Sequence, residues 1–241
     1  MPNSANFRER HPLPADVHTS RVAVQRVAEA LRTGGCPADR FFDRFLPDDL
    51  RVVSGQYWTP LAAAKRAAEW FDDLGVRTVV DIGSGAGKFC VAAALVGHSR
   101  YTGLEQRQSL VASARSLAMV FDVRDRVSFV HGALGVMATP SAEAYYLYNP
   151  FGQYFFGSRH DVDAGVEYNA TRHAHDVAAV EQLLRQAPIG TYVLTYNGFG
   201  GRVPAGYRQI RVDDKLPSDL RLWRKERSTP RFLFSIRSCD V

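Results

Sequence analysis

The sequence predicts an α/β fold in which helices cover both faces of a mostly parallel sheet. A continuous apolar run at Thr78–Ile82 is typical of a strand that is buried on both faces. After it, short strand patterns alternate with longer helical patterns as far as Gly200, and beyond Gly200 only strand patterns occur. Alternating strands and helices indicate βαβ units, and the last strands fit an antiparallel hairpin at one sheet edge. The expected fold class is therefore Rossmann-like, with an antiparallel C-terminal edge hairpin and an N-terminal helical annex.

The strands and helices of this fold are expected at ranges that turn signals separate. The strands are Thr78–Ile82, Tyr101–Leu104, Val127–Val130, Ala144–Tyr148, Thr191–Tyr196, Tyr207–Val212, Leu220–Trp223 and Phe232–Ile236. The helices of the alternating part are Gly87–Val96, Ser109–Phe121 and Asp176–Ala187, the last of which is closed by Pro188.

The N-terminal annex is expected to contain two helices. The apolar residues of Val17–Leu31 recur with the spacing of an amphipathic helix. The pattern of Asp39–Leu46 predicts a short helix that Asp39 caps at its N-terminus and Pro47 ends.

A further helix is expected to lead into the first strand. Thr59 has the residue type of an N-cap, Pro60 suits the first helical position, and Gly75 suits the position just after the helix. We therefore divide the chain into an N-terminal arm and helical annex at 1–56 and a main domain at 57–241.

Composition narrows the class of protein and its expected location. The chain has 241 residues, of which 46% are hydrophobic and 23% charged, as is ordinary for a globular protein. It has no apolar run long enough to span a bilayer, and its first residues lack the apolar core of a secretory signal. The three cysteines, Cys36, Cys90 and Cys239, form neither a metal-binding pair nor a disulfide framework. We therefore expect a cytoplasmic protein with no membrane partner and no metal.

The net charge of +5 comes largely from arginines and lysines after Gly200. Such a basic end could face nucleic acid or an acidic protein. Acidic residues are interleaved with it, however, so we favour a solvated edge strand whose charges discourage aggregation.

A Gly-rich turn follows the first strand and predicts a ligand site. Asp81, Gly83, Gly85 and Gly87 have the spacing DxGxGxG, and glycine allows both a left-handed backbone and close approach of a ligand. Asp81 would repel a pyrophosphate but attract a cationic ligand. Glu105, at the end of the next strand, can accept both hydroxyls of a ribose. A cation joined to a ribose without phosphate describes S-adenosylmethionine.

At these residues the chain resembles the class I S-adenosylmethionine-dependent methyltransferases. The resemblance covers roughly Trp58 to Trp223, with VVDIGSGAGKF as the first motif and GLE as the ribose-binding acid. It implies that S-adenosyl-L-methionine is the cofactor. It also implies roles for individual residues: Gly83, Ser84 and Gly85 line the methionine part, Glu105 holds the ribose, and Gln106 lies near the adenine.

One departure from the family pattern concerns the adenine. Many members carry an acid after the third strand, where this chain has Gly132 followed by Ala133. The adenine contact must then come from elsewhere, either the backbone or His131, which could equally be an ordinary residue at a strand end.

A second candidate motif, NPF, follows the fourth strand. Asn149, Pro150 and Phe151 would face the methyl group across the cofactor. An Asn oxygen and a carbonyl near Pro150 can accept the two N–H bonds of a planar amine, which biases the nitrogen towards tetrahedral geometry, and Phe151 can stack on the target ring. The alternative is that Asn149 and Pro150 only turn the chain.

NPF resembles the NPPY/F signature of adenine amino-group methyltransferases, with one proline missing. SGQYWTP resembles a GQFYTP-type segment of those enzymes, which would bring Tyr57, Thr59 and Pro60 to the methionine end of the cofactor. The order DIGSGAG, GLE and NPFG is also similar to that of non-SET histone lysine methyltransferases.

The sequence therefore predicts a methyltransferase with an unknown acceptor, for which an amino nitrogen of a small molecule, protein or nucleic acid is one candidate. The alternative is a non-catalytic S-adenosylmethionine-binding or scaffold module.

Overall fold

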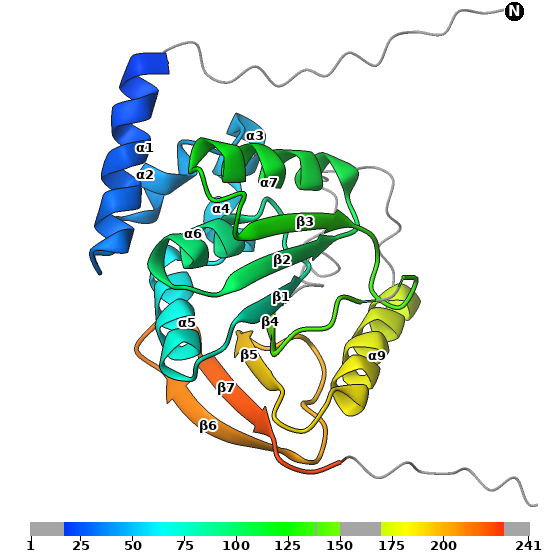
Figure 1. The fold of residues 1–241 in the computed structure, drawn as a ribbon. Helices are drawn as coiled ribbons and strands as arrows, with labels where there is room; N and C mark the ends of the chain where they lie inside the picture. Colours follow the sequence, from blue (N-terminus) through cyan, green and yellow to red (C-terminus); the bar gives the residue numbers. More distant parts are fainter. Residues whose placement is uncertain (1–16, 138, 150–169, 229–241) are drawn as a thin grey trace, which may run out of the picture.

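The computed structural model describes residues 17–137, 139–149 and 170–228, and the side chains from residue 21 onwards. These residues form one seven-stranded sheet with the order β3-β2-β1-β4-β5-β7-β6 (Figure 1). The strands are β1 (Thr78–Ile82), β2 (Arg100–Glu105), β3 (Val127–His131), β4 (Ala144–Tyr148), β5 (Tyr192–Tyr196), β6 (Tyr207–Asp213) and β7 (Leu220–Lys225). The predicted fold class is confirmed. The five strands β3, β2, β1, β4 and β5 are parallel, and β7 joins the sheet antiparallel to β5. The strand expected at Phe232–Ile236 lies outside the described residues.

Helices precede, connect and cover the strands. They are α1 (Val17–Arg32), α2 (Asp39–Asp43), α3 (Asp48–Val52), α4 (Ser54–Tyr57), α5 (Leu61–Asp73), α6 (Lys88–Val96), α7 (Gln108–Val120) and α9 (Ala170–Gln186). The short helices α3 and α4 were not predicted, because they are too short to show a hydrophobic period. Helix α9 begins before the predicted Asp176, whose carboxylate instead binds Arg172 one turn earlier.

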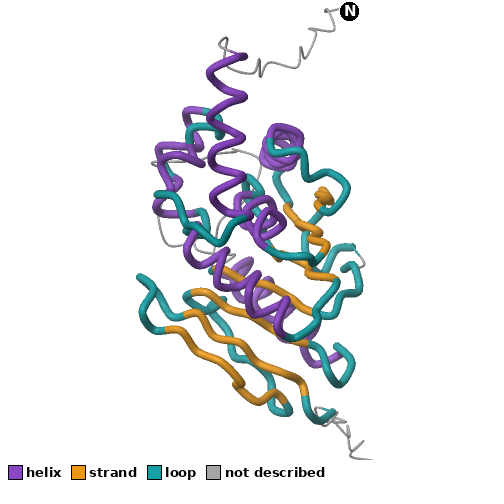
Figure 2. Tube along the Cα trace, turned by 60° about the vertical axis from the view of Figure 1, so that its left-hand side comes forward, coloured by secondary structure: helices purple, strands orange, loops and turns teal. Residues whose placement is uncertain are grey.

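The sheet separates two hydrophobic layers. On one face, Val79 and Tyr146 pack with α5, α6, α7 and the N-terminal helices. On the other, Val80 and Leu147 pack with α9. Successive strand residues point to opposite faces, so the continuous apolar runs supply both layers. Figure 2 shows the N-terminal helices gathered above the sheet and the C-terminal hairpin at its lower end.

The N-terminal helices share the first hydrophobic layer and are joined to it by polar contacts. Phe42, on α2, is fully buried and stacks on Phe121 with ring centroids 4.6 Å apart. The expected cap at Asp39 is wrong, because Ala38 is the N-cap of α2. The Asp39 carboxylate instead accepts the backbone N–H of Leu61 at 2.9 Å, at the start of α5.

The expected start of α5 is also wrong by one residue. Pro60, not Thr59, is the N-cap, and no side chain of its own turn caps the helix. The Thr59 hydroxyl hydrogen-bonds the Tyr146 hydroxyl at 2.9 Å, so its partner lies on β4. At the other end, Gly75 has the predicted left-handed backbone, with φ of +67°.

The C-terminal hairpin forms one edge of the sheet. Its arginines meet carboxylates: Arg208 lies 2.7 Å from Glu226, and Arg221 lies 2.6 Å from Asp219. These contacts agree with the expectation of a solvated, charged edge strand. Among the helices that the structure describes, none is long and apolar enough to cross a membrane.

Candidate active site

The Gly-rich turn joins β1 to α6 at the carboxyl end of the sheet. Gly83, Gly85 and Gly87 have φ values of +76°, +55° and +78°, so all three need the left-handed freedom that the sequence predicted for them. The N–H groups of Gly83 and Ser84 both donate to the carbonyl of Leu104, at 2.9 and 3.0 Å. These bonds fix the turn against the end of β2.

Two features of the turn bear on ligand binding. The Ser84 hydroxyl is buried and has no hydrogen-bond partner among the described residues. A Cβ on Gly85 would lie 2.3 Å from the ring of Trp58, so any larger residue would displace that ring. Trp58 itself is 6% exposed and donates its ring N–H to the carbonyl of Leu50 at 3.1 Å.

Asp81 lies at the end of β1 and is buried on the α6 side of the sheet. The Cys90 thiol donates to its carboxylate at 3.4 Å. Desolvation is the main cause that raises the pKa of Asp81 to about 7, with a further rise from the charge of Glu105. Burial also raises the pKa of the Cys90 thiol. The two side chains therefore form a weakly acidic pair behind the turn.

Glu105 ends β2 with both carboxylate oxygens engaged. Its Oε2 accepts the N–H of Gly85 at 2.9 Å, which links the carboxylate to the Gly-rich turn. Its Oε1 accepts the N–H and the Nε of Arg107, at 3.0 and 2.9 Å, and Arg107 Nη2 reaches Oε2 at 3.2 Å. Glu105 and Arg107 are 2% and 6% exposed, so this is a buried ion pair.

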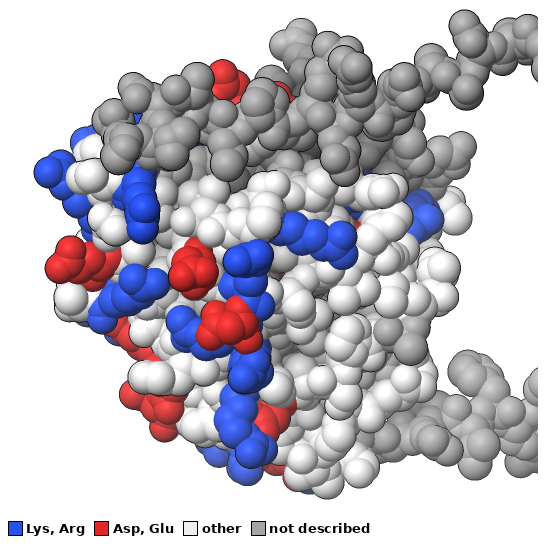
Figure 3. Space-filling view, turned by 45° about the horizontal axis from the view of Figure 1, so that its top comes forward, with Lys and Arg blue, Asp and Glu red and all other residues white. Residues whose placement is uncertain are grey.

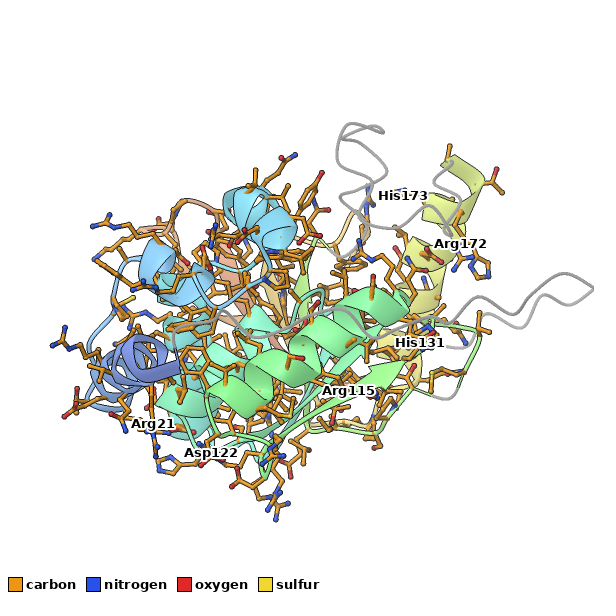
Figure 4. The ribbon with its side chains drawn as sticks, turned by 90° about the horizontal axis from the view of Figure 1, so that it is seen from above. Arg21, Arg115, Asp122, His131, Arg172 and His173 are labelled. Atoms are coloured by element: carbon orange, nitrogen blue, oxygen red, sulfur yellow. The ribbon has the colours of Figure 1, made fainter. Side chains whose placement is uncertain are left out.

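Gln106 connects β2 with β3 and α9. His131 Nε2 donates to the Gln106 carbonyl at 3.0 Å, and Arg172 donates to the Gln106 side-chain oxygen at 3.4 Å. Figure 4 shows His131 and Arg172 towards the same end of the sheet, with Arg172 on α9. No group of three side chains that could hold a metal occurs in the part of the chain that the structure describes.

The segment before α5 contributes Tyr57 and Thr59. Thr59 is 4% exposed, and its hydroxyl is bonded to Tyr146. Tyr57 is half-buried beside Trp58, with ring centroids 6.1 Å apart. The suggested contacts of Tyr57, Thr59 and Pro60 with the methionine end of a cofactor stay a prediction.

Asn149 follows β4 with an unusual backbone. Its φ is +35°, and its N–H donates to the carbonyl of Gly198, after β5, at 2.9 Å. Asn and Gly are the residues that adopt this conformation most readily. Pro150 and Phe151, the other two predicted catalytic residues, lie outside the described residues.

The strand register brings these groups to one edge of the sheet. Ile82 is aligned with Leu104 on β2 and with Leu147 on β4. The residues that follow, which include Gly83, Glu105 and Asn149, therefore leave the sheet at the same level. Ligands of open α/β sheets bind at this carboxyl edge.

Three residues near this edge were missed at the sequence level. They are Trp58, which covers Gly85; Lys88, which binds carboxylates of the annex; and Arg107, which binds Glu105. Arg107 lies only two residues after Glu105, so an oppositely charged pair at the strand end was the one available signal. The partners of Trp58 and Lys88 are distant in the sequence.

Comparisons with known proteins support the fold. No protein-family model matches the chain, and no curated protein matches its sequence significantly. An RNA methyltransferase from Salinibacter ruber, solved with S-adenosyl-L-homocysteine, is 22% identical; the match covers 72% of this chain and 96% of that one, with a TM-score of 0.52. A Bacillus cereus O-methyltransferase, also solved with S-adenosyl-L-homocysteine, is 14% identical over 88% of this chain and 100% of that one, with a TM-score of 0.52.

A third similar structure is described as a putative O-methyltransferase from Klebsiella pneumoniae. It is 13% identical over 84% of this chain and 97% of that one, with a TM-score of 0.52. The chain therefore has the class I methyltransferase fold. None of these three proteins is named as an adenine amino-group or histone lysine methyltransferase, so the resemblance to those subfamilies has no support from them.

Proposed function

We propose that the protein is an S-adenosylmethionine-dependent methyltransferase that transfers the methyl group to an amino nitrogen. The observation that carries this proposal is the meeting of the Gly-rich turn, Glu105 and Asn149 at one sheet edge, on a methyltransferase fold. The first two groups suit the cofactor, and the third suits the acceptor. The acceptor itself, whether small molecule, protein or nucleic acid, stays open.

The residues at this edge fit the chemistry of the cofactor. Glu105 is a carboxylate, an acceptor-only group that suits the hydroxyls of a ribose and disfavours a pyrophosphate, whereas Asp81 lies behind the turn next to Cys90. The buried hydroxyl of Ser84, which has no hydrogen-bond partner among the described residues, offers a polar contact in the turn. When bound there, S-adenosylmethionine would supply an electrophilic methyl group on its sulfonium.

The chain's own residues would bind and orient the reactants. Gly83, Ser84 and Gly85 would hold the methionine part, Glu105 the ribose, and Gln106 the adenine side. Asn149 would accept an N–H bond of the amine through Oδ1 and so direct the nitrogen lone pair towards the methyl group. Positioning of this kind can supply most of the acceleration, because the transfer needs no metal and no covalent enzyme intermediate.

A non-catalytic module that only binds S-adenosylmethionine is the second candidate. Such a module would bind the cofactor through the same residues. The two candidate functions differ in the role of Asn149, which would contact a methyl acceptor only in the enzyme.

Two measurements test the proposal in sequence. Calorimetry should detect binding of S-adenosylhomocysteine and no binding of NAD; the reverse result would overturn the cofactor assignment. Tritiated methyl transfer into a cell lysate should then label a protein, nucleic-acid or small-molecule fraction. Chemical analysis of the labelled product should find the methyl group on nitrogen. Cofactor binding without transfer into any fraction would favour the non-catalytic module, and label on oxygen would refute the amino acceptor.

A further inference from the structure

Glu105 is the residue on which the proposed ribose contact depends, and its acceptor capacity is already used by the protein. We propose that the Arg107 side chain is a latch that competes with the cofactor ribose for Glu105. Binding of the ribose then requires release of the Arg107 guanidinium. This inference rests on the proposed function, since it concerns how that same site admits its cofactor.

The count of hydrogen bonds at the carboxylate carries the argument. An ionised carboxylate offers about four lone-pair sites on its two oxygens. Oε1 accepts the Arg107 N–H and Nε, and Oε2 accepts the Gly85 N–H and Arg107 Nη2, all between 2.9 and 3.2 Å. Two ribose hydroxyls therefore find no open acceptor site on Glu105 while all four bonds persist.

While Glu105 keeps its side-chain conformation, only two of the four bonds can be released without a change in the backbone. The N–H of Gly85 belongs to the Gly-rich turn, and the N–H of Arg107 belongs to the N-cap residue of α7. Both are fixed by backbone geometry. The guanidinium bonds to Glu105 depend on side-chain torsions, and there are two of them, one on each carboxylate oxygen. Two ribose hydroxyls can replace them one for one.

Burial of the ion pair makes replacement of the guanidinium by the ribose hydroxyls costly in free energy. The pair is almost fully buried, with Arg107 6% and Glu105 2% exposed, so its bonds are stronger than those of an exposed ion pair. The ribose must therefore offset the loss of a buried contact, and the net affinity falls by that amount. A ligand that lacks the 2′ and 3′ hydroxyls of the ribose can bind without breaking the ion pair between Arg107 and Glu105.

Matched ligands and variants separate the latch from a positioning role. Calorimetry would compare adenosine with 2′,3′-dideoxyadenosine on the wild-type protein and on Arg107→Met and Arg107→Lys. The control is Arg115→Met, because Arg115 is an exposed arginine on the same helix α7 that donates to the carbonyl of Phe129.

The latch predicts a change that depends on the hydroxyls. Arg107→Met should bind adenosine about 10-fold more tightly than the wild type, the factor that corresponds to about 1.4 kcal/mol. Its affinity for dideoxyadenosine should stay nearly unchanged, and Arg107→Lys, which cannot bind both oxygens through a planar fork, should lie between. Arg115→Met should match the wild type with both ligands. If both Arg107 variants bind adenosine more weakly, Arg107 only orients Glu105 and the latch is refuted.

A structure of the wild-type protein with S-adenosylhomocysteine tests the same idea without a variant. The latch requires Nε and Nη2 of Arg107 to leave hydrogen-bond distance of Glu105 when the ribose is bound. Both guanidinium bonds intact beside a ribose bonded to Glu105 would overturn it and leave the cofactor assignment standing. Absence of S-adenosylhomocysteine binding to the wild type and every variant would instead refute the proposed function.

Discussion

Asn149 combines a strained backbone with a free amide at the position expected for catalysis. Among the described residues its side chain makes no hydrogen bond, whereas its N–H is held by the Gly198 carbonyl. Asn149 could be required for its structure, because Asn tolerates a φ of +35°, or for catalysis, because its amide oxygen can accept a hydrogen bond. A substitution that keeps the backbone and removes the amide distinguishes the two.

We predict that Asn149→Gly folds well and loses activity. Glycine accepts a positive φ without strain, so the melting temperature should stay close to that of the wild type. Loss of one preorganised polar group should lower kcat about 100-fold, with unchanged affinity for S-adenosylhomocysteine. Asn149→Ala should lose the same activity and also about 1 to 2 kcal/mol of stability, because alanine resists the left-handed region.

Melting temperature and specific activity of the two variants, measured together, decide the matter. A stable, fully active Asn149→Gly protein would show that Asn149 serves the turn alone.

Asp81 makes stability depend on pH. Burial raises its pKa from 3.8 to about 7, so between these values the folded state holds a proton that the unfolded state has lost. The stability that protonated Asp81 contributes to the folded protein is therefore fully present below pH 3.8 and is lost as the pH rises through about 7. Asp81→Asn removes this loss, because the amide does not ionise.

We predict that Asp81→Asn becomes more stable relative to the wild type as the pH rises from 5 to 8.5. From pH 5 up to the raised pKa of about 7 is a span of about two pH units, which at 1.36 kcal/mol for each unit sets an upper limit of about 3 kcal/mol on the relative gain. Urea unfolding of both proteins across this range measures it, and the other titrations cancel in the comparison. A difference that does not vary with pH would show that Asp81 ionises normally in the folded protein.

At the scale of elements, Lys88 ties the Gly-rich turn to the annex. It is the first residue of α6 and is 2% exposed, and its ammonium lies 2.6 Å from Asp39 and 2.7 Å from Asp43. It also donates to the Ser54 hydroxyl at 3.3 Å. The start of α6, and hence the end of the turn, is therefore fastened to α2 and α4.

We predict that Lys88→Met destabilises the protein by about 3 to 5 kcal/mol, the cost of leaving the buried Asp43 carboxylate, and the partly exposed Asp39 carboxylate beside it, without their shared partner. Asp43→Asn added to Lys88→Met should recover part of the loss, because it removes one of these charges. The control Arg221→Met breaks an exposed pair with Asp219 and should cost at most about 1 kcal/mol. Chemical denaturation measures all three, and a Lys88→Met protein as stable as the control would contradict the argument.

The elements also show what a sequence alone can predict. Strands such as Thr78–Ile82 and Ala144–Tyr148 were predicted with their observed bounds, because burial on both faces leaves an unbroken apolar run. The start of α5 was misplaced because its capping carboxylate, Asp39, comes from another helix. In the site, the glycines were predictable from spacing, whereas the bonds of Arg107 to Glu105 depend on how a side chain folds back at a strand end.

At the scale of the whole molecule, the charge pattern differs from its appearance in the sequence. Arginines after Gly200 pair with carboxylates, including Arg211 with Asp73 on α5 at 2.9 Å. On the opposite edge, Arg100, Arg115 and Arg126 donate to backbone carbonyls instead. Figure 3 views the molecule from the side of α7 and shows a band of Lys and Arg side chains with Asp and Glu beside it. On this face, acidic side chains therefore interrupt the band of positive charge.

The division of the chain at residue 56 is a prediction that the packing allows us to test. The layer on the α5–α7 side of the sheet includes Leu31, Phe42 and Leu50, all at most 3% exposed. Full burial of such side chains stabilises a protein by roughly 1.5 to 3 kcal/mol each, which together approaches the free energy of unfolding of a typical domain. Removal of the annex would expose their partners, Phe121 among them.

We predict that the fragment 57–241 fails to fold alone and that the full chain unfolds in one calorimetric transition. Phe42→Ala in the full chain serves as the milder control: it should cost about 3 to 5 kcal/mol and still give one transition, because it leaves a cavity in a shared core. Circular dichroism, calorimetry and S-adenosylhomocysteine binding would be measured on all three proteins. A stable fragment 57–241 that binds the ligand, or two transitions in the full chain, would establish the annex as a separate domain. A single transition would mean that the annex is part of the structure that holds the Gly-rich turn in place.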